Sequence, residues 1–215
     1  MIDLHTHSFF SDGELVPAEH LRRVEILGYE AIALTDHADS SNIDFIIPRI
    51  VQAAADLNKY SETKLLPGIE LTHVPPELVA ELAVKCRELG AKVVVAHGET
   101  VVEPVKPGTN HASLMADIDV LAHPGFITRE DADLAAEKGI FLELSGRKGH
   151  SLTNGHVAKM AMATGAKLAV NADAHGPSDF LTKEMAEIVA RGAGLSSERY
   201  QQIRKDMSVF LASLG

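Results

Sequence analysis

The sequence contains a single cysteine, Cys86, among its 215 residues. One cysteine excludes an internal disulfide, and this suits a chain kept in a reducing compartment. The sequence also lacks an apolar run long enough to cross a bilayer. Its first residues have neither the basic nor the apolar region of a secretory signal. We therefore expect a cytoplasmic protein without a membrane partner.

Basic residues are in the minority, because 20 lysines and arginines stand against 30 acidic residues and give a formal net charge of -10. This balance disfavours a nucleic-acid partner, whose binding normally needs a basic face or stripe. It does not exclude a small phosphorylated substrate, since bound metal cations would dominate the local field. Neither linkers nor low-complexity tracts interrupt the chain, so we expect one domain over residues 1–215, closed by a helix at about 196–213.

Histidine, by contrast, is abundant, with eleven residues. A short apolar segment at the N-terminus leads into His5 and His7, two positions apart. Residues i and i+2 of an extended strand point to the same side, so both imidazoles can face one metal ion. The pair alone is a weak signal, because such spacing also arises by accident. Support has to come from ligands elsewhere in the chain.

Short apolar strands alternate with helical segments along the whole sequence. The strands are predicted at residues 2–4, 30–35, 64–71, 91–96, 119–122, 140–144 and 167–171. The helices are predicted at residues 17–27, 43–60, 77–89, 111–116, 129–138, 153–164, 180–191 and 196–213. This alternation is typical of a parallel sheet covered by helices, either open or closed into a barrel.

Side chains that can bind metal follow every predicted strand except the sixth. They are His5, His7, His37, Glu70, His97, His123, Asp173 and His175. In an open sheet the ends of the outer strands lie too far apart to share a site, whereas all strand ends of a barrel surround one mouth. The distribution therefore predicts an α/β fold, a seven-stranded parallel barrel with outer helices.

Nitrogen and oxygen donors without thiolates suit zinc, manganese or iron. The candidate ligands outnumber those that one ion can coordinate, so we expect two or three divalent ions. Asp36 beside His37 could orient an imidazole or could anchor the loop after its strand, and both interpretations remain open.

Several histidines lack a place at a strand end. His20 lies within a helical segment and is expected to be solvated, and His150 follows no predicted strand directly. His73, just past Glu70, is a weaker candidate for the site.

The ordered motifs resemble those of the polymerase and histidinol phosphatase (PHP) family. They are His5-Thr6-His7 with Ser11-Asp12-Gly13, Thr35-Asp36-His37, Pro67-Gly68-Ile69-Glu70, Ala96-His97-Gly98, Ala122-His123-Pro124 and Asp173-Ala174-His175. The resemblance spans residues 2 to 175. It implies a distorted (β/α)7 barrel with a trinuclear metal centre that hydrolyses phosphoesters.

The resemblance also implies how the ligands are shared among three ions. One ion would take His5, His7, Glu70 and Asp173. A second would share Glu70 and take His97 and His123. The third would take Asp12, His37 and His175, and Asp12 stands where some members of the family have histidine. The resemblance adds Asp12, which lies in a loop that the count of strand ends leaves out.

The segment after the sixth predicted strand carries Arg147 and Lys148. It opens at the same mouth, where arginine can grip a phosphate with two nitrogens and lysine adds a point charge. Glu143, on that strand, either faces the barrel interior or supports the ligands.

The residues and the resemblance together predict a metal-dependent phosphoesterase for a small phosphorylated substrate. The family name suggests a phosphomonoester such as histidinol phosphate, and nucleotide monophosphates, 3',5'-bisphosphates and oligonucleotide ends stay equally open. A metal-bound hydroxide would attack phosphorus. Asp173, His37 and His175 are the predicted catalytic residues, and either histidine could protonate the leaving oxygen if the third ion is absent.

Two other functions stay open. A barrel amidohydrolase also begins with His-x-His, but it typically bridges its metals with a carboxylated lysine at a strand end. Here the fourth strand ends in His97, and Lys92 lies at its beginning. The other alternative is a non-catalytic PHP-like module of a nucleic-acid-processing complex, which the intact ligands and the acidic charge disfavour.

Overall fold

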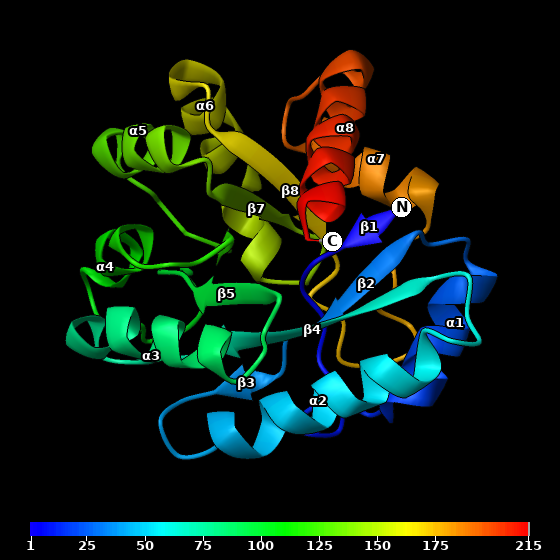
Figure 1. The fold of residues 1–215 in the computed structure, drawn as a ribbon. Coiled ribbons are helices and arrows are strands. Elements are labelled where there is room, and N and C mark those ends of the chain that lie inside the picture. The colour runs from blue at the N-terminus through cyan, green and yellow to red at the C-terminus, as the bar shows by residue number, and fades with distance from the viewer. Residues whose placement is uncertain (215) are drawn as a thin grey trace.

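The computed structural model describes residues 1–214 and shows strands surrounded by helices (Figure 1). The strands are β1 (Ile2–Asp3), β2 (Ala31–Leu34), β3 (His37–Ala38), β4 (Lys64–Leu71), β5 (Val93–His97), β6 (Val120–Ala122), β7 (Phe141–Ser145) and β8 (Lys167–Asn171). The helices are α1 (Pro17–Ile26), α2 (Ile43–Leu57), α3 (Pro76–Glu88), α4 (Thr109–Met115), α5 (Arg129–Lys138), the 3-10 helix η1 (His150–Thr153), α6 (Asn154–Thr164), α7 (Lys183–Gly192) and α8 (Ser197–Ser213).

All strand pairs are parallel, in the order β1-β2-β4-β5-β6-β7-β8, and β3 also pairs with β4. The register shows that β2 and β3 are parts of one strand. Leu34 pairs with Pro67 and His37 pairs with Glu70, so both segments keep the same offset along β4. Seven strand positions therefore surround the core, as the sequence predicts.

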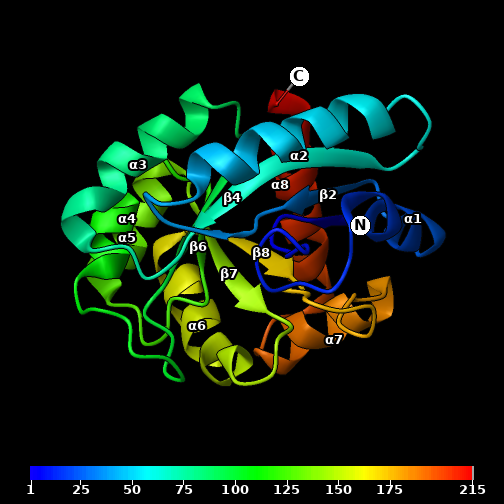
Figure 2. The same ribbon diagram turned by 90° about the horizontal axis from the view of Figure 1, so that it is seen from below.

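The seam between β1 and β8 closes the sheet into a barrel. At the mouth, the amide of Asp173 donates to the carbonyl of His5 at 3.0 Å, and the amide of His7 donates to that of Ala174 at 2.9 Å. Deeper in the seam, side chains complete the join: Asp3 accepts from the amide of Ala172 at 3.0 Å. The predicted distorted (β/α)7 barrel is confirmed, and Figure 2 shows its strands converging inside the ring of helices.

The helices follow local signals in the sequence. The chain begins α1 at Pro17 and leaves it through Gly28, whose φ of 74° is left-handed. Helix α7 begins at Lys183, three residues later than the predicted start, because Thr182 caps it by accepting from the amide of Met185.

One expectation for α1 is wrong. His20 is buried rather than solvated, because it shares the inward stripe of the helix with Leu21 and Val24.

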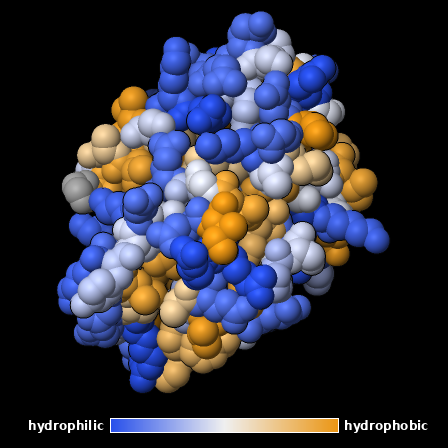
Figure 3. Space-filling model, turned by 90° about the vertical axis from the view of Figure 1, so that its right-hand side faces the viewer, coloured by the Kyte–Doolittle hydropathy of each residue, from blue (hydrophilic) through white to orange (hydrophobic). Residues whose placement is uncertain are grey.

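The surface around α1 and α7 carries apolar patches separated by hydrophilic side chains (Figure 3). Scattered exposed apolar groups are usual on folded chains. Within residues 1–214, the helices all fall short of the combined length and apolarity that crossing a membrane requires.

Candidate metal centre

The carboxyl ends of the parallel strands bring the predicted ligands together at one mouth. His5, His7 and Glu70 are fully buried, and His97, His123 and Asp173 are nearly so. Asp12 reaches the same mouth from the loop after β1.

The backbone is strained at this mouth. Non-glycine residues rarely take a positive φ, and it occurs within residues 1–214 at His73 (53°), His123 (27°) and Asp173 (52°). Such strain persists where the surrounding structure holds a residue in place, and it concentrates at functional sites. All three residues lie at the mouth.

The first predicted ligand set is buried inside the mouth. His5 Nε2 lies 3.4 Å from Glu70 Oε1, and His7 Nε2 lies 3.3 Å from Asp173 Oδ1. The donor atoms of His5, His7 and Glu70 form one compact group, and those of His5, Asp173 and His123 form another. The structure therefore brings the predicted four ligands together, with His123 close to them.

The second predicted set, Glu70, His97 and His123, also forms a compact group. The rings of His97 and His123 meet edge to face with centroids 4.4 Å apart, and His123 Nε2 is 3.7 Å from Glu70 Oε1. Because Glu70 Oε1 also faces His5, the first and second sets are adjacent.

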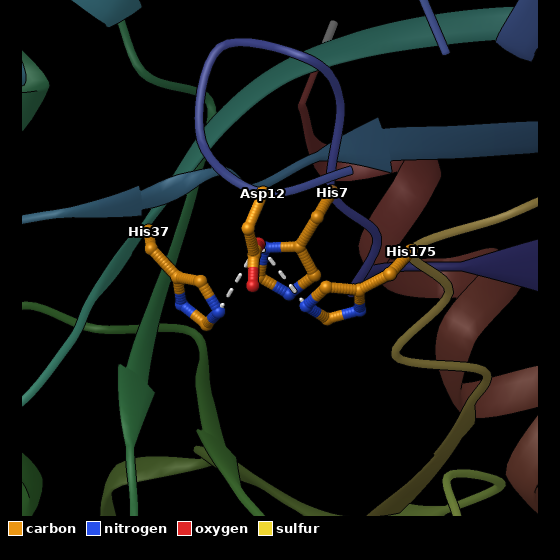
Figure 4. Close-up of side chains that lie close together, drawn as sticks. All are labelled: His7, Asp12, His37 and His175. Carbon is orange, nitrogen blue, oxygen red and sulfur yellow. Dashed lines mark ion pairs between the residues drawn. The ribbon is translucent and has the colours of Figure 1, made fainter. Parts of the chain in front are cut away.

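The third predicted set lies at the outer rim, where its side chains point toward one another (Figure 4). Asp12 Oδ1 is 3.2 Å from His175 Nε2 and 3.5 Å from His37 Nε2. His7 joins this group, with its ring centroid 4.1 Å from those of His37 and His175. His7 therefore connects the first set to the third, which the sequence did not indicate.

Buried polar atoms without partners show that these residues suit a metal. Buried atoms need hydrogen bonds, yet within residues 1–214 several donor atoms of this cluster have none: His5 Nε2, both ring nitrogens of His7, Glu70 Oε1, His123 Nδ1 and His175 Nε2. Divalent ions would satisfy such atoms, because neutral imidazoles and carboxylates are their ordinary ligands. The chemistry of the donor set thus fits divalent metal binding.

Burial and neighbouring charges set the protonation of the ligands. Burial lowers the pKa of His7 and of His123 well below the usual value, so both rings are neutral. Burial acts to raise the pKa of Glu70, but His37 and His5 outweigh it and hold that pKa well below the usual value. Burial acts to lower the pKa of His5 and of His37, but the neighbouring carboxylates outweigh it and raise both. Glu70 is therefore an ionised carboxylate beside two rings that favour their protonated form.

Glu143 on β7 supports two of the ligands from beneath. Its Oε1 lies 2.8 Å from His5 Nδ1 and accepts from Asn171 Nδ2 at 2.9 Å, while its Oε2 accepts from the amide of His123 at 3.0 Å. A carboxylate on the far nitrogen of a histidine fixes the ring and its tautomer. The two alternatives for Glu143 are therefore both met, because the buried side chain also supports the ligands.

Among residues 1–214, the carboxylate of Asp36 hydrogen-bonds to a loop and to no imidazole. It accepts from the amide of Ser8 at 2.8 Å and from that of Ser11 at 3.0 Å, and both hydroxyls also donate to it at 2.8 Å. This network fixes the loop after β1, which carries Asp12, and not the loop after the strand of Asp36 itself, so Asp36 anchors a different loop from the one predicted.

The predicted phosphate ligands differ in position. Arg147 enters the centre: its Nη1 donates to the carbonyl of Asp173 at 3.2 Å and contacts His175 Nδ1. Lys148 is exposed, in the wall of a cleft of about 560 Å³ that also touches Asp173 and His175.

The sequence patterns do not indicate two residues of the mouth, His150 and Glu103. His150, at the start of η1, is buried and stacks on His123 at 4.1 Å, and its Nδ1 lies 2.8 Å from Thr100 Oγ1. Glu103, from the loop after β5, is 3.0 Å from His97 Nε2. Loop residues have no strand period, so only the excess of histidine could have drawn attention to His150.

Comparisons with known proteins agree with this architecture. The PHP domain family matches residues 3–117, more than half of the chain. An uncharacterized protein of Methanocaldococcus jannaschii is 48% identical over 201 residues, which cover 93% of this chain and 92% of that protein.

Among solved structures, a Listeria monocytogenes protein proposed to be a histidinol phosphatase aligns with a TM-score of 0.61 at 11% identity. The alignment covers 84% of this chain and 97% of that one. A structure named as an amidohydrolase aligns with a TM-score of 0.54 at 13% identity, over 89% of this chain and 69% of that one. At such identities the likeness concerns the fold. The family match and the barrel together place this chain in the PHP domain family.

Proposed function

We propose that the chain is a metal-dependent phosphoesterase that hydrolyses a small phosphomonoester. The observation that carries the proposal is the meeting of adjacent ligand sets, joined through Glu70 and His7, with the guanidinium of Arg147 at their edge. Neighbouring divalent ions in these sets would supply a nucleophile near neutral pH and neutralise charge on phosphoryl oxygens.

Arg147 is the proposed phosphate ligand of the chain itself. Its Nη1 also lies 3.8 Å from Asp173 Oδ1, so the guanidinium is held over the centre and keeps donors for a phosphoryl oxygen. Lys148 adds positive charge at the cleft wall. The pair would bind the dianionic end of a substrate despite the net charge of -10.

The cleft suggests how the rest of the substrate is held. Beyond Arg147 and Lys148 its wall continues through Phe180, Leu181 and Met185. A phosphate at the cationic end would place an organic group against these apolar side chains. The size of the cleft suits a small molecule rather than a polymer.

The proposed roles at the rim follow from position. Asp173 lies between Arg147 and His7, where its carboxylate would orient the attacking water. His37 and His175 are only partly buried at the outer rim, so either can donate a proton to the leaving oxygen when the Asp12 set holds no ion.

The test is turnover of p-nitrophenyl phosphate and a panel of small phosphomonoesters by the purified protein, with metal analysis of the same preparation. We expect a chelator to abolish turnover and zinc or manganese to restore it. His123→Gln should remove activity, whereas His111→Gln, in an exposed pair with Asp131 on α4 and α5, should retain it. Absence of turnover with every divalent metal would refute the proposal.

The same assay separates the alternatives. In an amidohydrolase of the lysine-bridged kind, a lysine would have to reach the metals. Here β5 delivers His97 to the mouth, while Lys92 precedes the strand at the opposite end. Hydrolysis of amides without hydrolysis of phosphoesters would favour that class, and metal binding without any turnover would favour a non-catalytic module.

A further inference from the structure

Glu103 lies at the rim of the mouth and gathers three histidines from separate elements. Its Oε2 is 3.0 Å from both His97 Nε2 and His73 Nε2, and its Oε1 is 3.4 Å from His150 Nε2. His73 follows β4, His97 ends β5 and His150 begins η1. The donor atoms of His73, His97 and Glu103 are as compact a group as the inner ligand sets.

His73, His97 and Glu103 are called the outer trio below. The backbone holds this outer trio in place. The loop that carries Glu103 is closed at its base, because Glu99 Oε1 accepts from the amides of Gly108 and Asn110, at 2.9 and 3.0 Å. His73 keeps a left-handed φ of 53°, which a histidine adopts only where the fold imposes it. Both exposed members of the trio are therefore positioned by the backbone.

His97 belongs both to the outer trio and to the inner set of Glu70 and His123, and it faces both through the same ring nitrogen. Its Nδ1 lies 3.1 Å from the carbonyl of Gly98, so Nδ1 carries the hydrogen and Nε2 is the ligand atom. One nitrogen binds one ion at a time. His97 can therefore bind an ion held by Glu103 and His73, or an ion held by Glu70 and His123, but not both at once.

Exposure differs sharply between these alternatives. The side chains of His73 and Glu103 are 39% and 36% exposed, whereas that of His97 is 2% exposed and that of Glu70 is fully buried. A cation that arrives from solvent on this side of the mouth therefore meets the outer pair before it reaches Glu70.

We propose that His73 and Glu103 form a loading site for divalent cations, which passes an ion to the inner set of Glu70 and His123 by exchanging the other ligands while His97 stays bound. The carboxylate of Glu103 attracts the hydrated ion, and His97 is the shared ligand of both positions. This inference rests on the metal centre of the proposed function and adds the route by which that centre fills.

The test measures zinc uptake rather than activity. Metal-free protein, prepared with a chelator, is mixed in a stopped-flow instrument with zinc and a zinc-sensitive dye, and bound zinc per chain is counted after gel filtration. We expect Glu103→Gln to slow uptake about ten-fold through the loss of a charged guide. His73→Gln should slow uptake to a similar extent because it removes a ligand of the loading site. The final zinc count should equal that of the wild type. The double variant should be no slower than the slower single variant, because both belong to one site.

His111→Gln is the matched control, since it alters an exposed histidine–carboxylate pair outside the mouth and should load at the wild-type rate. His123→Gln should lower the final count and so report the inner set. Wild-type uptake rates in both outer variants would overturn the loading site. A loss of one zinc per chain would also overturn it, by making Glu103 a permanent ligand. A wild-type protein that binds no zinc would refute the metal centre itself.

Discussion

Replacing Glu143 by glutamine tests whether the carboxylate beneath the centre sets its metal affinity. The substitution keeps size and shape but not the ability to accept at both oxygens. In the structure, Oε1 of Glu143 faces His5 Nδ1 and the side-chain amide of Asn171, and Oε2 faces the backbone amide of His123. Either orientation of the glutamine amide therefore turns an NH₂ group toward a donor.

The cost follows from that mismatch. A buried donor left unpaired costs about 1–3 kcal/mol, and Glu143 is fully buried. The mismatch also frees the ring of His5, whose far nitrogen is the ligand atom. Loss of such support typically weakens metal binding about 10–100-fold, which equals about 1.4–2.8 kcal/mol. The two ranges agree, so we expect Glu143→Gln to raise the zinc Kd by about 30-fold.

The assay is competition for zinc against a chromophoric chelator, with urea unfolding of the metal-free protein alongside. Glu81→Gln, at an exposed position of α3, is the matched control and should change neither quantity. A Kd for Glu143→Gln within about three-fold of the wild type would refute the assignment of Glu143 as the support of His5. A loss of stability alone would make its role purely structural.

Three further predictions concern other sites. Burial lowers the pKa of His20 to about 4, so unfolding takes up a proton below its usual pKa of 6.5. The free energy of unfolding therefore keeps its full contribution from His20 above pH 6.5 and falls by about 3 kcal/mol toward pH 4. Urea unfolding of the wild type and of His20→Leu should differ by an amount that changes with pH in this way. A difference independent of pH would contradict the prediction. Arg147→Lys should raise the KM for p-nitrophenyl phosphate about ten-fold at unchanged zinc content, and an unchanged KM would remove Arg147 from phosphate binding. Gly125→Ala should lower the free energy of unfolding, measured with urea, by about 3 kcal/mol. The reason is that a Cβ at residue 125 would lie 1.9 Å from the carbonyl oxygen of Glu99 and that φ there is 63°. An unchanged urea midpoint would show that this turn relaxes.

The strand pattern predicted the barrel because each strand carries its own signal. Short apolar runs mark the strands, and the ligand that follows every strand but the sixth fixes the direction in which the strand enters the mouth. The break between β2 and β3 is less visible, since Thr35 and Asp36 continue the sequence pattern and Asp36 still accepts at its carbonyl from the amide of Glu70 on β4. Element ends were less accurate, as the late start of α7 shows.

The contents of the mouth could be predicted only in part. Strand-end residues such as His97 follow from periodicity, whereas Asp12 needed the family motif. Glu103 and His150 come from loops, where no repeat distance relates sequence to position. His20 is a different case: Leu21 and Val24 on the same helical stripe already indicated that it faces inward.

The residues after β2 link the barrel to the outermost ligand set. Asp36 keeps its backbone beside β4, because its carbonyl accepts from the amide of Glu70 at 3.1 Å. Its side chain turns toward the loop after β1 and accepts four hydrogen bonds from Ser8 and Ser11, so the loop that presents Asp12 becomes fixed to the sheet. His37, the next residue, pairs with Glu70, and its Nε2 lies 3.5 Å from Asp12 Oδ1. Successive side chains of an extended segment point to opposite sides, so this one strand end positions two ligands of the third set, Asp12 through its loop and His37 directly.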